Sequence, residues 1–280
     1  MDTLIQAVVM GIVQGLTEFL PISSSGHLIV VPALLGWDDP FIGSLAFSVM
    51  LHLATLLALL LFFRADWLRL VPAWFGSLRD RSIGADPDRR LAWLLVLSTI
   101  PAVVAGLVLN DLIETTFREA RLVAVTLVVG AVILWLAERV GSRTRRIADL
   151  STAGALGIGV AQAIALVPGI SRSGISISAG LFAGLDRESA ARFSFLMATP
   201  ITAGAGLYEL RKLVAGESGV DASLGPLLAG MIASLVAGLA AISILLRFLR
   251  THPTTIFIAY RILLSAVIVV AWLGLWDRQG

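Results

Sequence analysis

Six segments of this sequence are apolar over a length that can cross a lipid bilayer, and this feature limits the fold more than any other. A membrane-spanning helix needs about 20 mostly apolar residues. The segments that meet this requirement are 44–63, 91–110, 121–138, 190–208, 226–247 and 255–276. The composition agrees, since only 14% of the residues are charged, whereas a soluble domain has about 25%. The sequence therefore predicts an all-α integral membrane protein, with one polytopic domain over residues 1–280.

The charge and the cysteine content exclude several classes of protein. The formal net charge is only +2, and the arginines lie in short runs between apolar segments, so we expect no nucleic-acid partner. The chain has no cysteine, which excludes disulfides, a thiolate nucleophile and a cysteine-based metal site. The N-terminal segment MDTLIQAVVMGIVQG lacks a basic region, so we expect it to belong to the mature fold rather than to a cleaved signal peptide.

Two further apolar regions, 3–36 and 152–185, are interrupted in the middle by PISSSGH and PGISRSG respectively. Backbone can leave the helix at membrane depth only where protein or a water-filled cavity satisfies its polar groups. We therefore expect each region to form a re-entrant hairpin, which enters and leaves the membrane on the same side.

The arginines predict which loops face the cytoplasm, because basic residues favour that side. Loops 64–90 and 139–149 are rich in arginine, and with two re-entrant hairpins the basic loops 185–192 and 247–253 fall on the same side. The loops expected on the outer side are acidic or mixed: the loop around Asp38 and Asp39, 111–120 and 209–224.

The two halves of the chain, 1–148 and 149–280, resemble each other. At an offset of 148 residues, Gln14, Ser23, Ser25 and Gly26 align with Gln162, Ser171, Ser173 and Gly174. Each half has three expected spans. Because three crossings leave the chain on the opposite side of the membrane, the second half would start there and be inverted relative to the first. The two hairpins would then enter from opposite faces and meet near the midplane, where inverted-repeat membrane proteins have their binding sites.

The first interruption combines a carboxylate, hydroxyls and an imidazole. Gln14 and Glu18 are four residues apart, so they lie on one face of a helix that Pro21 ends. A carboxylate inside a membrane usually faces a partner or an aqueous cavity. The alternative is a polar patch at a helix end that bonds only to the broken backbone.

The serines at 23–25 precede Gly26, which would permit a sharp turn that returns His27 over them. Serine is a poor nucleophile unless a base such as imidazole activates it. The pattern therefore favours a hydroxyl and base pair. The alternative is that a serine caps the next helix while His27 bonds to a carbonyl.

The second interruption is suited to an anion. Glycines Gly169 and Gly174 flank Ser171, Arg172 and Ser173, so successive amides can form an anion-binding turn at a helix start. The guanidinium of Arg172 fits phosphate oxygens. The alternative is a structural ion pair between Arg172 and Glu18. Together the two interruptions favour hydrolysis of a membrane-resident phosphate ester or anhydride.

EFLPISSSGH and PGISRSG resemble the two signature motifs of the bacterial undecaprenyl-diphosphatase family, often called bacitracin-resistance proteins, and the resemblance runs essentially from end to end. It implies hydrolysis of undecaprenyl diphosphate to undecaprenyl phosphate and inorganic phosphate, which recycles the lipid carrier of cell-wall synthesis and confers bacitracin resistance. It also implies a bacterial plasma-membrane enzyme whose site opens to the periplasmic or outer face.

The resemblance assigns Ser24 as nucleophile, His27 as base, Glu18 as the acidic group and Arg172 as the phosphate clamp. The surrounding residues would contact the substrate: Gln14, Ser23, Ser25, Gly26, Gly169, Ser171, Ser173 and Gly174. The family's activity depends on a divalent cation, which implies Mg²⁺ or Ca²⁺ near Glu18. Where the family has Glu or Gln, this chain has Gln14, so only one carboxylate and one amide oxygen are available to the metal.

Several alternatives stay open at this point. A transporter or flippase of polyprenyl phosphate lipids is the rival function, because broken helices and inverted repeats are typical of transporters. The expected partners are the polyprenyl diphosphate substrate and membrane lipids, with a homodimer as an open alternative. His52, inside the first expected span, is interpreted as a packing or interface group.

Overall fold

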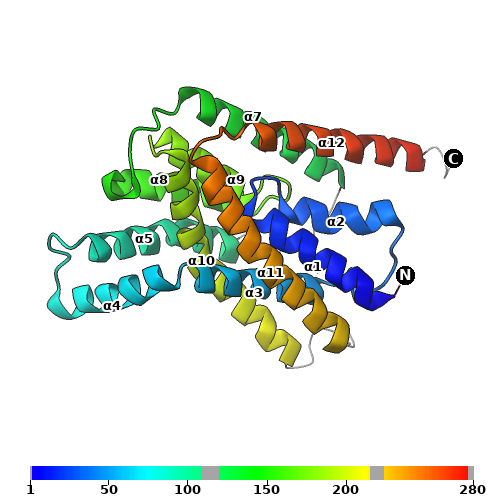
Figure 1. Cartoon of the computed structure of the whole chain (residues 1–280), viewed down its shortest axis with the longest axis horizontal. Coiled ribbons are helices and arrows are strands. Elements are labelled where there is room, and N and C mark those ends of the chain that lie inside the picture. The colour runs from blue at the N-terminus through cyan, green and yellow to red at the C-terminus, as the bar shows by residue number, and fades with distance from the viewer. Residues whose placement is uncertain (1, 109–119, 215–223, 277–280) are drawn as a thin grey trace.

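The computed structural model describes residues 2–108, 120–214 and 224–276, which are almost entirely helical (Figure 1). No β-strand occurs among these residues apart from an isolated bridge between Arg145 and Leu185. The α-helices are α1 (Thr3–Phe19), α2 (Ser24–Leu35), α3 (Leu45–Phe62), α4 (Arg64–Asp80), α5 (Pro87–Val108), α7 (Ala120–Val140), α8 (Thr152–Ile164), α9 (Arg172–Phe182), α10 (Arg187–Val214), α11 (Leu224–Leu249) and α12 (Thr255–Trp276). A short 3₁₀ helix, η1, spans Ile147–Asp149.

Five of the described helices are long and apolar enough to cross a membrane: α3, α5, α7, α11 and α12. Large apolar side chains stand exposed on them, for example Val125, Ile232 and Val270. Such side chains are stable when they face lipid. The protein is therefore a multi-pass all-α membrane protein. The sixth expected span, 190–208, lies within α10, which is not among the five; its first turns carry Arg187, Glu188 and Arg192.

Residues 64–80 differ from the sequence prediction, which assigned them to a loop. They form α4, an amphipathic helix that packs against α5 (Figure 1). Leu70 is buried, and Trp67 and Trp74 pack on the same core, at the three- and four-residue spacing of one helix face. A low mean hydropathy concealed this helix, because its opposite face carries arginine and aspartate.

Small residues bring the remaining helices close together. A Cβ at Gly11 of α1 would lie 2.1 Å from the carbonyl oxygen of Gly230 on α11. A Cβ at Gly159 of α8 would lie 2.2 Å from the carbonyl oxygen of Ser98 on α5. Close backbone contact through small residues is typical of helix packing in membranes. α7 and α12 form a further pair and lie side by side along one edge of the molecule (Figure 1).

The arginine-rich loops gather at one end of the bundle. The buried carboxylate of Glu138 accepts hydrogen bonds from Arg143 at 2.7 Å, from Arg187 and from the Thr254 hydroxyl at 2.9 Å. Arg250 pairs with Glu188 at 2.7 Å. The contacts join the loops before α8, α10 and α12, so the basic loops share one face.

The opposite end carries the start of α1 and the loop after α2. The Thr3 hydroxyl donates to Asp39 Oδ2 at 2.6 Å. This hydrogen bond, with those from the amides of Phe41 and Ile42, holds the pKa of Asp39 below its ordinary value. The predicted loops 111–120 and 209–224 fall mainly on residues outside the described ranges.

Candidate active site

The first break in the chain separates α1 from α2. α1 ends at Phe19, and the next residue, Leu20, has an extended conformation. Pro21 follows, so the helix ends where the proline predicts. The turn is made at Ser23, which has a φ of 74°, and its Oγ accepts a hydrogen bond from the Gly26 amide at 3.4 Å. The prediction of a sharp turn at Gly26 is therefore wrong. Gly26 lies inside α2, because Ser23 takes both the turn and the helix cap.

The second break, between α8 and α9, has the same local structure. Ser171 has a φ of 71°, and its Oγ accepts from the Gly174 amide at 3.2 Å. Gly169 also has a positive φ, 89°. A Cβ there would lie 1.9 Å from Thr126 Oγ1 and 2.8 Å from the carbonyl oxygen of Val123, so the position accepts only glycine.

The two breaks touch each other. The Ser173 hydroxyl donates to the carbonyl oxygen of Leu20 at 3.0 Å, and the Gly169 amide donates to Ser25 Oγ at 3.5 Å. Segments about 150 residues apart in the sequence thus form one site. Both α2 and α9 begin at this site. The first backbone amides of a helix have no hydrogen-bond partner within the helix. Such termini favour anions.

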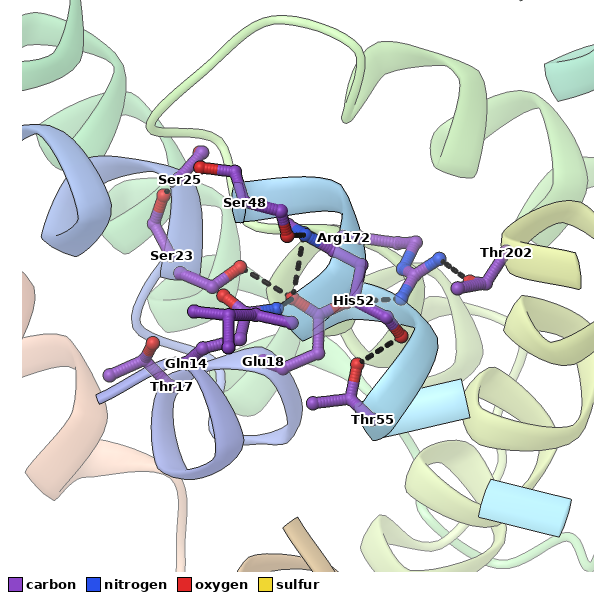
Figure 2. A network of polar contacts seen from close by, with 12 residues as sticks. Gln14, Thr17, Glu18, Ser23, Ser25, Ser48, His52, Thr55, Arg172 and Thr202 are labelled. Carbon is purple, nitrogen blue, oxygen red and sulfur yellow. Dashed lines mark hydrogen bonds and ion pairs between the residues drawn. The ribbon is translucent and has the colours of Figure 1, made fainter. Parts of the chain in front are cut away.

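Glu18 is the centre of the polar network (Figure 2). It is only 7% exposed. Its Oε2 accepts from the Ser24 hydroxyl at 2.6 Å and from Gln14 Nε2 at 3.1 Å, and its Oε1 pairs with Arg172 Nη2. Arg172 also donates to the hydroxyl of Thr202 on α10. The structure therefore brings Glu18, Ser24 and Arg172 into one cluster from both breaks.

His52 of α3 belongs to this cluster as well (Figure 2). Its Nδ1 lies 2.8 Å from the carbonyl oxygen of Ser48, which can only accept, so Nδ1 carries a proton. Its Nε2 lies 3.5 Å from Glu18 Oε2. The sequence interpretation as a packing group missed this contact. The signal was present, because an ionisable side chain within an apolar span is by default a candidate functional residue.

In the described residues, His27 is hydrogen-bonded to groups other than the Ser24 hydroxyl. Its Nδ1 lies 2.7 Å from the carbonyl oxygen of Ser23 and so donates to it, while Nε2 lies 2.7 Å from the hydroxyl of Tyr260 on α12. The two rings also stack, with centroids 5.6 Å apart. Both ring nitrogens are thus occupied, and the expected hydroxyl and base pair of Ser24 with His27 does not form.

The remaining predicted residues form the two serine turns. Ser23 and Ser25 have their Oγ atoms 3.2 Å apart, and Ser171 and Ser173 have theirs 3.3 Å apart. The paired turns are alike in cap, in dihedral angle and in this hydroxyl contact. Each turn directly precedes a residue of the cluster, Ser24 after Ser23 and Arg172 after Ser171.

Gln14 and Glu18 provide the oxygen atoms that a divalent cation would need. Gln14 Oε1 is buried and has no hydrogen-bond partner among the described residues. An acceptor oxygen in that state fits a hard cation, and Mg²⁺ is often held by one or two protein oxygens together with substrate phosphates. The described ranges contain no group of three His, Cys, Asp or Glu that could hold a metal without the substrate.

Comparison with known proteins identifies the family. The sequence profile described as bacitracin resistance protein BacA matches residues 7–267. The chain belongs to this family. The match includes every residue of the site, from Gln14 to Tyr260.

Relatives in the BacA family align over nearly the whole chain. A protein named undecaprenyl-diphosphatase from Gemmatimonas aurantiaca is 47% identical over 266 residues, which are 95% of this chain and 97% of that protein. Proteins of the same name from Thermomicrobium roseum and Desulforudis audaxviator are 46% and 45% identical, and in both cases 95% of this chain and 96% of the relative are covered.

Proposed function

We propose that this protein hydrolyses undecaprenyl diphosphate to undecaprenyl phosphate and inorganic phosphate. The observation that carries the proposal is the cluster of Glu18, Ser24 and Arg172, assembled from both breaks in a chain of the BacA family. The relatives' name gives the substrate. The reaction would recycle the lipid carrier of cell-wall synthesis, and loss of the diphosphate lipid that bacitracin binds would confer resistance.

In the proposed reaction, Arg172 and the first-turn amides of α9 bind the diphosphate. The Ser24 hydroxyl, which donates a hydrogen bond to Glu18 Oε2 at 2.6 Å, transfers its proton to that oxygen. Ser24 Oγ then forms a bond to the terminal phosphorus. The bond between that phosphorus and the bridging oxygen breaks, and undecaprenyl phosphate leaves. Water then attacks the phosphorus of this phosphoserine, and the bond between Ser24 Oγ and that phosphorus breaks. Oγ takes the proton back from Glu18, and inorganic phosphate is released. Glu18 takes the role that the sequence gave to His27, whose nitrogens are bonded elsewhere.

The alternative route has no covalent intermediate. Glu18 would then take a proton from water, which attacks the terminal phosphorus directly. Ser24 would only orient Glu18 in that case. Trapping of phosphate on Ser24 distinguishes the two routes, and an Ser24→Ala variant with near-normal turnover would exclude the covalent one.

A divalent cation, Mg²⁺ or Ca²⁺, fits this reaction as a proposal. Gln14 Oε1 and Glu18 would hold it, together with oxygens of the diphosphate. When bound, the ion would neutralise phosphate charge. Arg172 and the helix N-termini bind the same charge from the other break.

The proposed topology has six membrane-crossing helices, α3, α5, α7, α10, α11 and α12, and two re-entrant hairpins, α1–α2 and α8–α9. Residues 1–148 and 149–280 would be inverted repeats. The helix contacts support this arrangement. Gly159 of α8 lies 148 residues after Gly11 of α1, which is the offset of the two breaks. Each of these glycines meets a backbone carbonyl oxygen of another helix, Gly11 that of Gly230 on α11 and Gly159 that of Ser98 on α5.

The proposed location is the bacterial plasma membrane, with the site open to the outer face. The gathering of arginine-rich loops at one end supports this, because that end would face the cytoplasm. The same repeat architecture favours the transporter of polyprenyl phosphate lipids as the second candidate function.

Phosphate release by the pure protein in detergent tests the function, since no compartments exist there for a transporter. We expect release from undecaprenyl diphosphate, and a fall of about 100-fold or more for Arg172→Ala, which removes the anion clamp. Arg69→Ala is the matched control, because Arg69 is exposed and, among the described residues, forms its ion pairs with Asp66 and Asp88 at the arginine-rich end. Full release by Arg172→Ala would contradict the proposed site.

A further inference from the structure

Arg261 is a charged side chain buried in the middle of the protein. It belongs to α12, one of the helices long and apolar enough to cross a membrane, and it is 0% exposed. No carboxylate of the described residues lies within ion-pair distance of it. A charged group in such a position is costly, and it is usually retained for a function.

The guanidinium of Arg261 is bound to backbone carbonyl oxygens of three segments. Nη2 donates to Ile170 at 2.6 Å and to Gly169 at 3.0 Å, both in the second break. Nη1 lies 3.5 Å from the carbonyl oxygen of Pro21, in the first break. Nε donates to Leu127 of α7 at 3.2 Å. One side chain thus contacts both breaks and the helix behind them.

Two glycines make room for this side chain. A Cβ at Gly130 of α7 would lie 1.9 Å from Arg261 Nη2, and a Cβ at Gly174 of α9 would lie 2.6 Å from Nη1. The guanidinium therefore fills a space bounded by backbone on two sides. Its planar shape, with donors pointing in several directions, suits this space better than the single ammonium group of lysine.

The carbonyls that Arg261 binds are close in sequence to the groups that react. Pro21 is three residues before Ser24, and Ile170 is two residues before Arg172. The positive-φ serines at 23 and 171 lie between each carbonyl and its functional residue. Any shift of these carbonyls would therefore pass directly to the Ser24 hydroxyl and the Arg172 guanidinium.

We infer that Arg261 is a positioning residue for the proposed diphosphatase reaction: it holds the two breaks at the spacing at which Ser24 and Arg172 meet at Glu18. The inference rests on the proposed function. It predicts that moving the guanidinium impairs turnover in protein that is still folded, since a displacement of about 1 Å in an active site can cost about 100-fold in rate.

Two variants displace the guanidinium in different ways. Arg261→Lys keeps the charge but cannot reach carbonyls on both breaks at once, and Gly130→Ala keeps Arg261 but places a methyl group in its space. Each has a matched control. Ser265→Ala removes a second side-chain hydrogen bond from α12 to α7, which goes to the carbonyl oxygen of Ala124 at 2.8 Å. Gly157→Ala adds a methyl group where no atom lies within 4 Å.

The readouts are kcat and KM for phosphate release from undecaprenyl diphosphate, per amount of monodisperse protein, together with the thermal unfolding midpoint. We expect a fall in kcat of about 10- to 100-fold in Arg261→Lys and Gly130→Ala. We expect less than a twofold change in both controls. KM is expected to change less than kcat in the two test variants, because the diphosphate contacts survive while their alignment with Ser24 is lost.

The outcomes separate the inference from the function. Wild-type protein without phosphate release would overturn the proposed function and the inference with it. An active wild type with unchanged kcat in folded Arg261→Lys and Gly130→Ala would overturn the inference alone. The inference also fails if both variants yield no folded protein, or if their kcat falls only as far as that of Ser265→Ala, because Arg261 would then have a structural role alone.

Discussion

Glu18 brings a negative charge into the interior of a membrane protein, and its neighbours make this possible. Arg172 pairs with one carboxylate oxygen, and Ser24, Gln14 and His52 surround the other (Figure 2). A buried carboxylate without such partners would be strongly unfavourable. The partners that compensate the charge, Ser24 and Arg172, are also the residues through which the two breaks meet at Glu18.

His52 gives a prediction at this scale. We expect His52→Leu to lower kcat/KM for phosphate release by about 10-fold, because Glu18 loses one polar neighbour and the loss of such a contact costs about 1–2 kcal/mol. His52→Gln should stay within a few-fold of the wild type, since the amide keeps a polar group beside Glu18. The measurement is steady-state phosphate release in detergent.

The histidine that the sequence favoured provides the comparison. Tyr260→Phe removes the hydroxyl that contacts His27 and leaves the surroundings of Glu18 intact. If His52→Leu has wild-type activity while Tyr260→Phe is inactive, the working imidazole is His27 and the proposed role of Glu18 is wrong. Thermal midpoints of both variants exclude unfolding as the cause.

The structure brings together the residues that the two interruptions offer, and it adds to them residues that depend on tertiary packing. Glu18, Ser24 and Arg172 were recognisable because each lies in a polar interruption of an apolar region. His52 and Thr202 come from α3 and α10, and only the packing of these helices brings them to the site. The hydrogen-bond partners of His27 could not be predicted either, because the turn lies at Ser23 rather than at Gly26.

At the level of elements, both breaks depend on a serine with a positive φ. Only a few non-glycine residues adopt such a conformation, and it costs about 1 kcal/mol or more. The cap that each serine makes to the amide three residues later compensates for part of this cost. Because the same arrangement occurs twice, we interpret it as a built feature of the fold.

The contact between α1 and α11 gives the prediction at this level. We expect Gly11→Ala to destabilise the protein by about 1–3 kcal/mol, because the added methyl group would collide with backbone at Gly230, which cannot rotate away. Thermal unfolding in detergent should show a midpoint lower by several degrees.

The matched control for Gly11→Ala is Gly157→Ala on α8, where the new methyl group meets nothing within 4 Å. There the higher helix propensity of alanine should leave stability equal or raise it by up to about 1 kcal/mol. Equal midpoints for the two variants would show that α1 and α11 are not held together as closely as this packing requires.

Helix existence was largely predictable from apolar length, since each expected span corresponds to one helix of the described residues, with bounds that agree within a few residues where both ends are described. Two features were not. α4 is amphipathic, and its polar face lowered the hydropathy that the prediction used. The bounds of α10 extend beyond the expected 190–208 in both directions, because charged first turns continue a helix without continuing an apolar segment.

The whole molecule is asymmetric in charge from end to end. Arginines from three loops gather around Glu138 and Glu188 at one end, and Arg192 joins Asp66 of the fourth basic segment, 64–90, to that end. The start of α1 and the loop at Asp39 occupy the other end. Basic loops favour the cytoplasmic side, and this preference acts on each loop separately. Four loops with the same preference therefore set one orientation for the entire bundle.

This orientation can be measured directly, because the chain contains no cysteine. Single cysteines can be placed at Asp38, Ser82 and Thr144, all of which are exposed in loops. In right-side-out membrane vesicles, we expect a membrane-impermeant maleimide to label Asp38→Cys at once. Ser82→Cys and Thr144→Cys should react only after permeabilisation, since both lie at the arginine-rich end. Immediate labelling of Ser82→Cys with protection of Asp38→Cys would reverse the orientation and turn the active site away from the outer face.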